Sequence, residues 1–302
     1  MEKVRRWRPD WPCPVARIVT QQRRGTGDPT FRVEASGALR RGLRTPVGTA
    51  ALKITVESTE VVGTAWGDGA EWALDALPAL CGALDDPSGF TPHHEAVAQG
   101  WRRHPHLRLG RTGLVMEALV PSILEQKVTG KQAFGAFRQL VTRHGERAPG
   151  PYADLFVQPS PQAIAQIPSW EWLKLQVDPV RSKTLVGACR RAVALERVAV
   201  LEDAEEVDRR LRSLPGIGVW TAAEVRQRAL GDADAVSFGD YHLAHHVGWA
   251  LFGHDIDDTR LAEVLECYRP QRGRAATMAV LGGQARPRRG PRMSVPTHLP
   301  TW

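Results

Sequence analysis

The stretch that decides the fold runs from Leu214 to Tyr241. It begins Leu-Pro-Gly-Ile-Gly-Val-Trp-Thr-Ala (214–222) and ends Val-Ser-Phe-Gly-Asp-Tyr (236–241). Two glycines let the backbone come close to a ligand without Cβ clashes. A helix that starts behind them has unpaired N–H groups and a positive dipole end, which suit a phosphate. Residues 203–214 also suit a helix, so the sequence predicts a helix–hairpin–helix with its turn at 212–221.

The alternative interpretation of the turn is a glycine-containing connection between two helices with no ligand. A bare Gly-x-Gly favours that alternative. The full Leu-Pro-Gly-Ile-Gly string in front of a helix favours a phosphate site.

A single carboxylate, Asp240, follows Trp220 by twenty residues. The segment between them suits a helix over 221–230, a turn over 231–234 and a short apolar run. Asp240 is therefore expected at the start of the next helix, close to the hairpin, where the helix dipole stabilises an anion. An ordinary N-cap is the alternative role of an Asp at this place. Its spacing from the hairpin favours a catalytic role.

Composition limits the classes of protein. The chain has 302 residues, 42% of them hydrophobic, and a net charge of +7. This predicts a soluble globular protein with one large or two smaller domains and a polyanionic partner. No apolar run is long enough to span a membrane, and the N-terminus lacks the apolar core of a signal peptide. The four cysteines lie far apart, which argues against a zinc finger or a compact iron–sulfur site. We expect a reduced, cytoplasmic protein.

The sequence changes from a strand-type to a helix-type residue pattern near residue 85, which predicts an α+β protein. Residues 1–85 suit a small antiparallel sheet with a packed helix, and residues 92–281 suit a larger all-helical domain. The basic tail, 282–302, contains no acid, and we expect it to be disordered. The strands are expected at 15–20, 30–35, 50–57 and 60–66, and the helices at 69–84, 114–127, 131–144, 160–167, 180–195 and 203–214, with a final pair after Asp257 or Asp258.

Segment 214–241 resembles the helix–hairpin–helix (HhH-GPD) superfamily of base-excision DNA glycosylases. The branch it resembles most is the inducible 3-methyladenine DNA glycosylase II, which has a Pro-Gly-Ile-Gly-x-Trp-Thr-Ala hairpin and a catalytic Asp followed by Tyr. The resemblance extends over roughly residues 10–281. It is specific at the hairpin and the Asp, moderate at 114–131 and weak in the sheet. The family's small sheet domain beside a helical body agrees with the change from strand-type to helix-type sequence near residue 85.

The resemblance implies a role for each matching residue. Asp240 would be the catalytic acid, and Trp220 and Tyr241 would line the base pocket together with Glu224. The hairpin would hold DNA phosphate, and its carbonyl groups would bind a structural monovalent cation, K⁺ or Na⁺, with no other cofactor expected. The implied DNA-binding residues are Gly216, Gly218, Val219, Thr221, Leu124 and Lys127, and the implied cation ligands are the backbone carbonyls of Arg212, Leu214 and Ile217.

Three of these positions have a second interpretation. Leu124 matches the wedge that fills the gap left by a flipped nucleotide, but it also suits the core of an amphipathic helix. Lys127 follows it and suits an exposed helix lysine equally well. Glu224 departs from the branch, which has an aromatic residue there. A glutamate would favour a cationic base or point to solvent, which leaves the substrate range open.

The resemblance also implies the type of reaction. Members of the superfamily with lyase activity have a lysine just after the hairpin glycines. This chain has Val219, Trp220 and Thr221 there, and no lysine follows Lys183. We therefore expect a monofunctional glycosylase that flips an alkylated purine from damaged double-stranded DNA and leaves an abasic site.

Other functions stay open at this stage. One is a related glycosylase for another damaged or mismatched base, and another is a non-catalytic helix–hairpin–helix DNA-binding module. His242 and His246 have the i, i+4 spacing of metal ligands, but no third ligand is evident, which favours surface or DNA-facing histidines. We expect a monomer that is associated with the nucleoid and not with a membrane.

Overall fold

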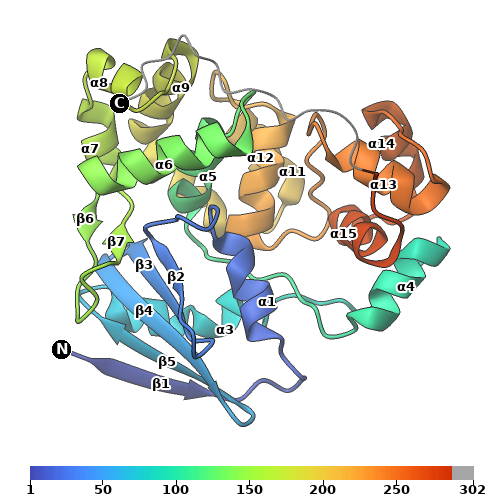
Figure 1. Cartoon of the computed structure of the whole chain (residues 1–302), viewed down its shortest axis with the longest axis horizontal. Coiled ribbons are helices and arrows are strands. Elements are labelled where there is room, and N and C mark those ends of the chain that lie inside the picture. The colour runs from blue at the N-terminus through green and yellow to red at the C-terminus, as the bar shows by residue number, and fades with distance from the viewer. Residues whose placement is uncertain (288–302) are drawn as a thin grey trace.

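The structure, a computed structural model, describes residues 1–287 (Figure 1). A five-stranded antiparallel sheet is formed near the N-terminus, and most of the remaining described chain is helical. In Figure 1 the sheet lies at the lower left, the helical body above it, and the helices α4 and α13–α15 at the right. This arrangement confirms the predicted α+β class.

The sheet has the strand order β1-β5-β4-β3-β2. Two short helices, α2 (Ala70–Asp75) and α3 (Leu77–Leu80), pack on it, and Leu74 and Leu77 fit against Gly63, where a Cβ atom would meet them at 2.9 and 2.8 Å. The strands are β1 (Lys3–Trp7), β2 (Phe31–Val33), β3 (Leu39–Thr45), β4 (Gly48–Glu57) and β5 (Glu60–Trp66).

The prediction of a strand at 15–20 was wrong. This segment is the helix α1 (Val15–Val19), followed by the 3₁₀ turn η1 (Thr20–Gln22). Val15, Ile18 and Val19 are buried on one side of α1, at helical spacing. Pro14 stands immediately before the helix, a place that proline tolerates well. Tertiary packing here overrides the preference of β-branched residues for strands.

The helical part contains twelve α-helices between residues 95 and 282 of the described chain. They are α4 (Glu95–Arg103), α5 (Val115–Leu124), α6 (Gly130–His144), α7 (Pro161–Gln166), α8 (Ser169–Lys174), α9 (Pro179–Cys189), α10 (Ala192–Glu196), α11 (Ala204–Arg212), α12 (Val219–Val225), α13 (Leu243–Phe252), α14 (Asp258–Glu266) and α15 (Arg272–Gly282). The shorter elements are a hairpin of β6 (Glu146–Arg147) and β7 (Phe156–Val157), the 3₁₀ turn η2 (Arg197–Val200) and the π-helical turn η3 (Arg226–Leu230).

Side-chain caps fix several helix starts. Ser160, Asp178, Asp203 and Asp257 each accept a backbone N–H from the first turn of the helix that follows. These caps confirm the helix starts that were predicted at 160, after 178, at 203 and after 257, because Ser and Asp side chains satisfy N–H groups that would otherwise lack partners.

The helices form two separate cores. One core is built mainly from α5, α6, α9, α10 and α12. The other is built from α4, α13, α14 and α15, where glycines let α4 and α15 approach closely. Within residues 1–287, no helix is long and apolar enough to cross a membrane.

Leu114, which lies beyond both predicted domain boundaries, packs into the core of the sheet. The boundaries at residues 85 and 92 stay predictions. The tail predicted at 282–302 begins with the last residue of α15, and its residues 288–302 lie outside the described part of the chain.

A buried ion pair anchors α15 to the segment after α3. Arg274 donates to Asp85, and the two side chains are 1% and 4% exposed. We expect Arg274→Met to lower the free energy of unfolding by about 3–5 kcal/mol, because it leaves the Asp85 carboxylate buried without its cation. Urea unfolding measures this. As a control, Arg260→Met removes the exposed pair with Glu263 and should cost less than about 1 kcal/mol.

Candidate active site

The predicted hairpin is present. It connects α11 to α12 through residues 213–218, with Gly216 in the left-handed region at φ +87°. Gly218 precedes α12, and no side chain caps that helix. Among the described residues, nothing accepts a hydrogen bond from the N–H groups of Val219 and Trp220. The turn therefore presents free backbone donors at the positive end of a helix, as a phosphate site requires.

The predicted cation ligands lie in the same turn. The carbonyl of Leu214 accepts the N–H of Ile217 at 3.1 Å. Within residues 1–287, the carbonyl of Ile217 in the turn accepts no hydrogen bond, and the carbonyl of Arg212 accepts none from outside α11. Oxygen atoms without hydrogen-bond donors suit a hard cation. The arrangement therefore fits the expected ion at two of the three carbonyls.

Asp240 lies just before α13. Its Oδ1 accepts the backbone N–H groups of His242 and Leu243, both at 2.8 Å, and its Oδ2 accepts the indole N–H of Trp220 at 3.3 Å. The first two contacts are those of a helix cap. The third joins the carboxylate to the first turn of α12, directly behind the hairpin. The structure therefore brings Asp240, Trp220 and the hairpin together.

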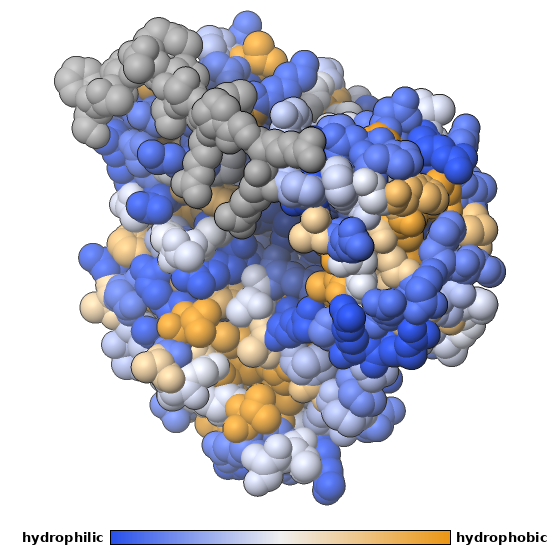
Figure 2. All heavy atoms as spheres, turned by 45° about the vertical axis from the view of Figure 1, so that its right-hand side comes forward, coloured by the Kyte–Doolittle hydropathy of each residue, from blue (hydrophilic) through white to orange (hydrophobic). Residues whose placement is uncertain are grey.

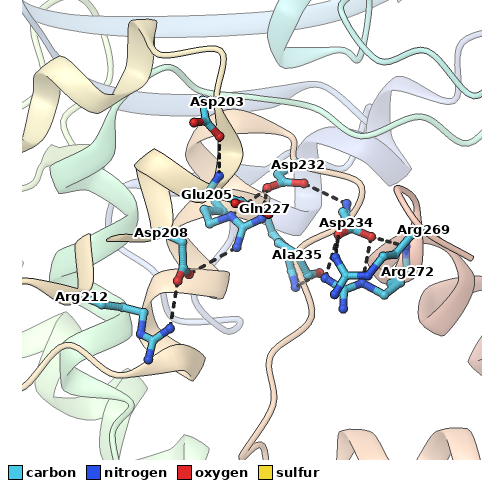
Figure 3. A network of polar contacts seen from close by, with 11 residues as sticks. Asp203, Glu205, Asp208, Arg212, Gln227, Asp232, Asp234, Ala235, Arg269 and Arg272 are labelled. Carbon is cyan, nitrogen blue, oxygen red and sulfur yellow. Dashed lines mark hydrogen bonds and ion pairs between the residues drawn. The ribbon is translucent and has the colours of Figure 1, made fainter. Parts of the chain in front are cut away.

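Ion pairs hold the segment that leads from the hairpin to Asp240 (Figure 3). Arg226 bridges Asp208 of α11 and Asp232, at 3.3 and 2.6 Å. Two residues further on, Asp234 accepts two hydrogen bonds from the guanidinium of Arg272, at 2.9 and 2.7 Å. Partly buried charged pairs with fork geometry restrict a loop more than exposed ones. The spacing between hairpin and carboxylate is fixed in this way by side chains far apart in the sequence.

A cavity of about 350 Å³ lies beside Asp240. Its walls come from α12, from the segment before Asp240, and from α13 and α15. The lining residues are Glu224, Gln227, Ala235, Val236, Ser237, Asp240, His242, Leu243, His246, Gly273, Ala276, Thr277, Val280 and Leu281. Figure 2, in which the right-hand side of Figure 1 comes forward, shows a hollow near the middle of that face.

Glu224 lies in the cavity wall, where the sequence left its role open. Its side chain is 12% exposed. One carboxylate oxygen accepts the hydroxyl proton of Ser237 at 2.7 Å, and the other accepts Nε of Arg228 at 3.2 Å. Glu224 therefore does not point to solvent, and its carboxylate is held in one orientation.

Two imidazoles from the start of α13 also line the cavity. The rings of His242 and His246 stack with centroids 5.5 Å apart and planes 16° apart. Burial lowers the pKa of His246, and the neighbouring His242 and Arg286 lower it further. The Asp240 carboxylate opposes this lowering of the His246 pKa. Within residues 1–287, no group of three or more His, Cys, Asp or Glu side chains is placed to hold a metal ion.

The two predicted aromatic residues of the pocket lie elsewhere. Trp220 contacts Asp240, but it is not among the described residues that line the cavity. Tyr241 is 77% exposed and lies edge-on to His242, with centroids 4.9 Å apart. The cavity wall is formed by imidazole and aliphatic side chains, and it contains no Trp, Tyr or Phe from the described part of the chain.

The predicted wedge, Leu124, is fully buried in the core around α5. A wedge must be exposed to enter DNA, so this position agrees with the alternative interpretation, a core leucine. Lys127 is exposed in the turn after α5 and has φ +54°.

Sequence reasoning missed Gln126, which lies between these two residues. Its amide donates to the carbonyl of Gly216 at 2.9 Å and to the hydroxyl of Thr221 at 2.8 Å. Gln126 therefore braces the hairpin against the end of α5. Thr221, a predicted DNA-binding residue, is buried and bonded to Gln126, whereas Val219 is 39% exposed. No pattern near Gln126 indicates a partner 90 residues away.

Comparison with known proteins identifies proteins with a similar sequence. No protein-family model matches the chain. A protein from two strains of Mycobacterium tuberculosis, described as "Probable bifunctional transcriptional activator/DNA repair enzyme AlkA", is 29% identical over 220 residues, which are 68% of this chain and 43% of the relative. The chain therefore spans less than half the length of the curated relatives it matches.

Solved structures of other proteins share the fold of nearly the whole chain. A 3-methyladenine DNA glycosylase from Archaeoglobus fulgidus has a TM-score of 0.73 at 18% identity, over 91% of this chain and 97% of the other. An 8-oxoguanine glycosylase/lyase from Clostridium acetobutylicum has a TM-score of 0.64 at 12% identity, over 87% and 90%. With the hairpin and Asp240 in place, these likenesses confirm the predicted resemblance: the chain has the fold of the helix–hairpin–helix DNA glycosylases and is similar in sequence to AlkA.

Proposed function

We propose that the chain is a DNA glycosylase that removes alkylated purines from duplex DNA by hydrolysing the N-glycosidic bond. The observation that carries this proposal is the position of Asp240. Its carboxylate lies at a cavity of about 350 Å³ and is bonded to Trp220, directly behind a hairpin with free backbone donors. The similarity to AlkA and to a 3-methyladenine DNA glycosylase supports alkylated bases as the substrate class.

The geometry suits hydrolysis in three steps. The hairpin N–H groups hold the DNA backbone, and the +7 charge of the chain favours the approach of DNA. The damaged nucleotide then flips into the cavity, which costs a few kcal/mol. As the bond to the base lengthens, positive charge develops on the sugar, and the Asp240 carboxylate stabilises it. The base departs with the electron pair of the broken bond, water adds to the sugar carbon and gives up a proton to solvent, and an abasic site remains.

Base release from methylated DNA tests the proposal. Duplex DNA treated with dimethyl sulfate contains 3-methyladenine and 7-methylguanine. We expect the protein to release free methylated purines, which chromatography separates and identifies. A protein that binds the duplex but releases no base would instead be a DNA-binding module. Release of hypoxanthine or uracil alone would show a glycosylase for other bases.

The same reaction tests the monofunctional part of the proposal. Within the described residues no lysine follows α12 and none lines the cavity beside Asp240, so the cavity supplies no amine to form a Schiff base. We expect the DNA strand to stay intact after base release and to break only on later treatment with alkali. Strand cleavage before alkali, or trapping of the protein on DNA by borohydride, would contradict this.

The hairpin cation is also part of the proposal. Carbonyls of Arg212, Leu214 and Ile217 would hold K⁺ or Na⁺, which completes the phosphate site by adding positive charge. Replacing both ions with tetramethylammonium at constant ionic strength should weaken duplex affinity severalfold, as measured by fluorescence anisotropy. Gly218→Ala, whose hairpin no longer receives the phosphate, should not respond to the exchange.

A further inference from the structure

Two adjacent acids, Asp257 and Asp258, stand at the start of α14, and the sequence left open which of them caps the helix. The Asp257 carboxylate is the cap, because it accepts the backbone N–H of Arg260 at 2.8 Å. Asp258 is the first residue of the helix, and its Oδ2 accepts the backbone N–H of Gly239 at 2.9 Å. Asp258 therefore reaches the loop that ends at Asp240.

The loop that carries Asp240, residues 236–240, is short and contains a flexible point. Two backbone hydrogen bonds of 2.9 and 3.1 Å close it on itself. Gly239 is exposed, lies in the left-handed region at φ +86°, and an added Cβ there would meet no atom within 4 Å. Since glycine has the widest choice of backbone conformations, packing alone does not fix the chain at this point. The hydrogen bond from the Gly239 N–H to Asp258 fixes it from outside the loop.

The other carboxylate oxygen of Asp258 argues against a purely structural role. Oδ1 is buried, and no described residue donates a hydrogen bond to it. A buried carboxylate oxygen without a donor lowers the stability of the folded chain, which an apolar side chain at this position would not do. Polar groups that are kept in such a state are typical of functional sites.

We propose that Asp258 is a positioning residue of the glycosylase: it acts through Gly239 to fix where the Asp240 carboxylate stands at the cavity. The inference rests on the proposed function and adds a residue outside the cavity wall, because Asp258 is not among the described residues that line it. The Asp240 side chain is oriented by two N–H groups at the start of α13 and by Trp220. Asp258 fixes the backbone beneath that side chain.

The reaction depends on accurate placement of Asp240. A carboxylate stabilises the positive charge on the sugar most strongly if it stands in place before that charge develops. A displacement of about 1 Å can lower a rate by roughly a hundredfold. Loss of the Asp258 contact should therefore slow the chemical step, while the hairpin and its binding of the duplex stay unchanged.

Two variants of Asp258 test this role. Asp258→Ala removes the acceptor, and we expect it to lower the single-turnover rate of methylated-base release by roughly tenfold or more. Asp258→Asn keeps a carbonyl oxygen for the Gly239 N–H and should recover most of the rate. Anisotropy with an undamaged duplex should give both variants an affinity no weaker than that of the wild type, because each substitution removes a negative charge. If Asp258→Ala does not fold, Asp258→Ser, whose side chain is one bond shorter, takes its place.

Asp257→Ala is the matched control for loosening of α14. It removes the helix cap one residue away and leaves the contact between Asp258 and Gly239 in place. It should therefore lower the urea midpoint of unfolding but keep the wild-type rate of base release. A loss of rate as large as that in Asp258→Ala would overturn the positioning role, because disorder at the start of the helix would then be sufficient to explain it.

A double variant shows whether Asp258 acts through Asp240. If it does, adding Asp258→Ala to Asp240→Asn should lower the remaining rate only slightly, because residues that act as one unit are not additive. A full second loss in the double variant would show an independent effect and overturn the inference, as would a wild-type rate in folded Asp258→Ala. Both of these outcomes leave the glycosylase function standing. A wild type that releases no methylated base overturns the proposed function itself, and the inference with it.

Discussion

Asp240→Asn is expected to abolish most base release while duplex binding is kept. Removing one preorganised charge from a reaction centre lowers rates by roughly 10²–10³-fold. The substitution conserves shape, and an Asn carbonyl can still accept the N–H groups of His242 and Leu243 at the start of α13. The new amide N–H faces the indole N–H of Trp220, which is a small loss at one contact. The hairpin is not altered, so DNA affinity should stay within a few-fold of the wild type.

Two measurements check this expectation. Single-turnover release of methylated bases gives the rate of the chemical step, and anisotropy with an undamaged duplex gives affinity. Asp257→Asn is the matched control, because Asn caps a helix as well as Asp and this residue is an exposed cap of α14. Equal loss of DNA binding in Asp240→Asn would show that the carboxylate is only a structural cap.

Local signals in the sequence were enough to predict the hairpin, the helix caps and the place of Asp240. Each depends on residues within a few positions of one another: a Gly-x-Gly string, a Ser or Asp before a helix, a carboxylate at a fixed spacing. The α+β class was predicted from the change of strand-type to helix-type residue patterns along the chain. These features could be predicted because the forces that decide them act over one or two turns of helix.

Features that depend on distant partners were missed. Strand β3 reads Leu-Arg-Arg-Gly-Leu-Arg-Thr and does not look like a buried strand. Its Arg41 is nevertheless 5% exposed, because Glu117 of α5 neutralises it, and no local pattern shows that pair. β1 pairs with β5 across more than 50 residues in the same way. An Arg-rich segment is assigned to the surface unless its buried partner is known.

The cavity could not be predicted for the same reason. Its walls combine α12, α13 and α15, and α15 lies about 50 residues after Glu224, held by the buried pair of Arg274 and Asp85. Leu124 is an error of the opposite kind, because a DNA contact was predicted where the structure has a buried core residue. It matched a wedge by resemblance, whereas every residue from Val120 to Leu124 is buried, so this turn of α5 has no exposed face.

Gly216→Ala and Gly218→Ala are expected to separate the stability of the hairpin from its binding of phosphate. At Gly216, φ is +87° and an added Cβ would lie 2.2 Å from the hydroxyl oxygen of Thr184. That hydroxyl is bonded to the carbonyl of Val180 within α9 and cannot move away freely. The left-handed strain alone costs about 1–3 kcal/mol. We therefore expect Gly216→Ala to lower the free energy of unfolding by at least that amount and to weaken DNA binding.

Gly218 has the opposite character. Its backbone is extended, and a Cβ there would meet no atom within 4 Å. The free energy of unfolding should therefore change by less than about 0.5 kcal/mol. Duplex affinity should still fall, because the added methyl group stands where the phosphate approaches the N–H groups of α12. Urea unfolding and salt-dependent anisotropy measure the two effects. Gly135→Ala, in open space inside α6, is the control for DNA affinity, and it should raise the free energy of unfolding by about 0.5–1 kcal/mol because Ala favours a helix interior. Wild-type affinity in a stable Gly218→Ala variant would show that no phosphate binds at this turn, and that the hairpin only connects two helices.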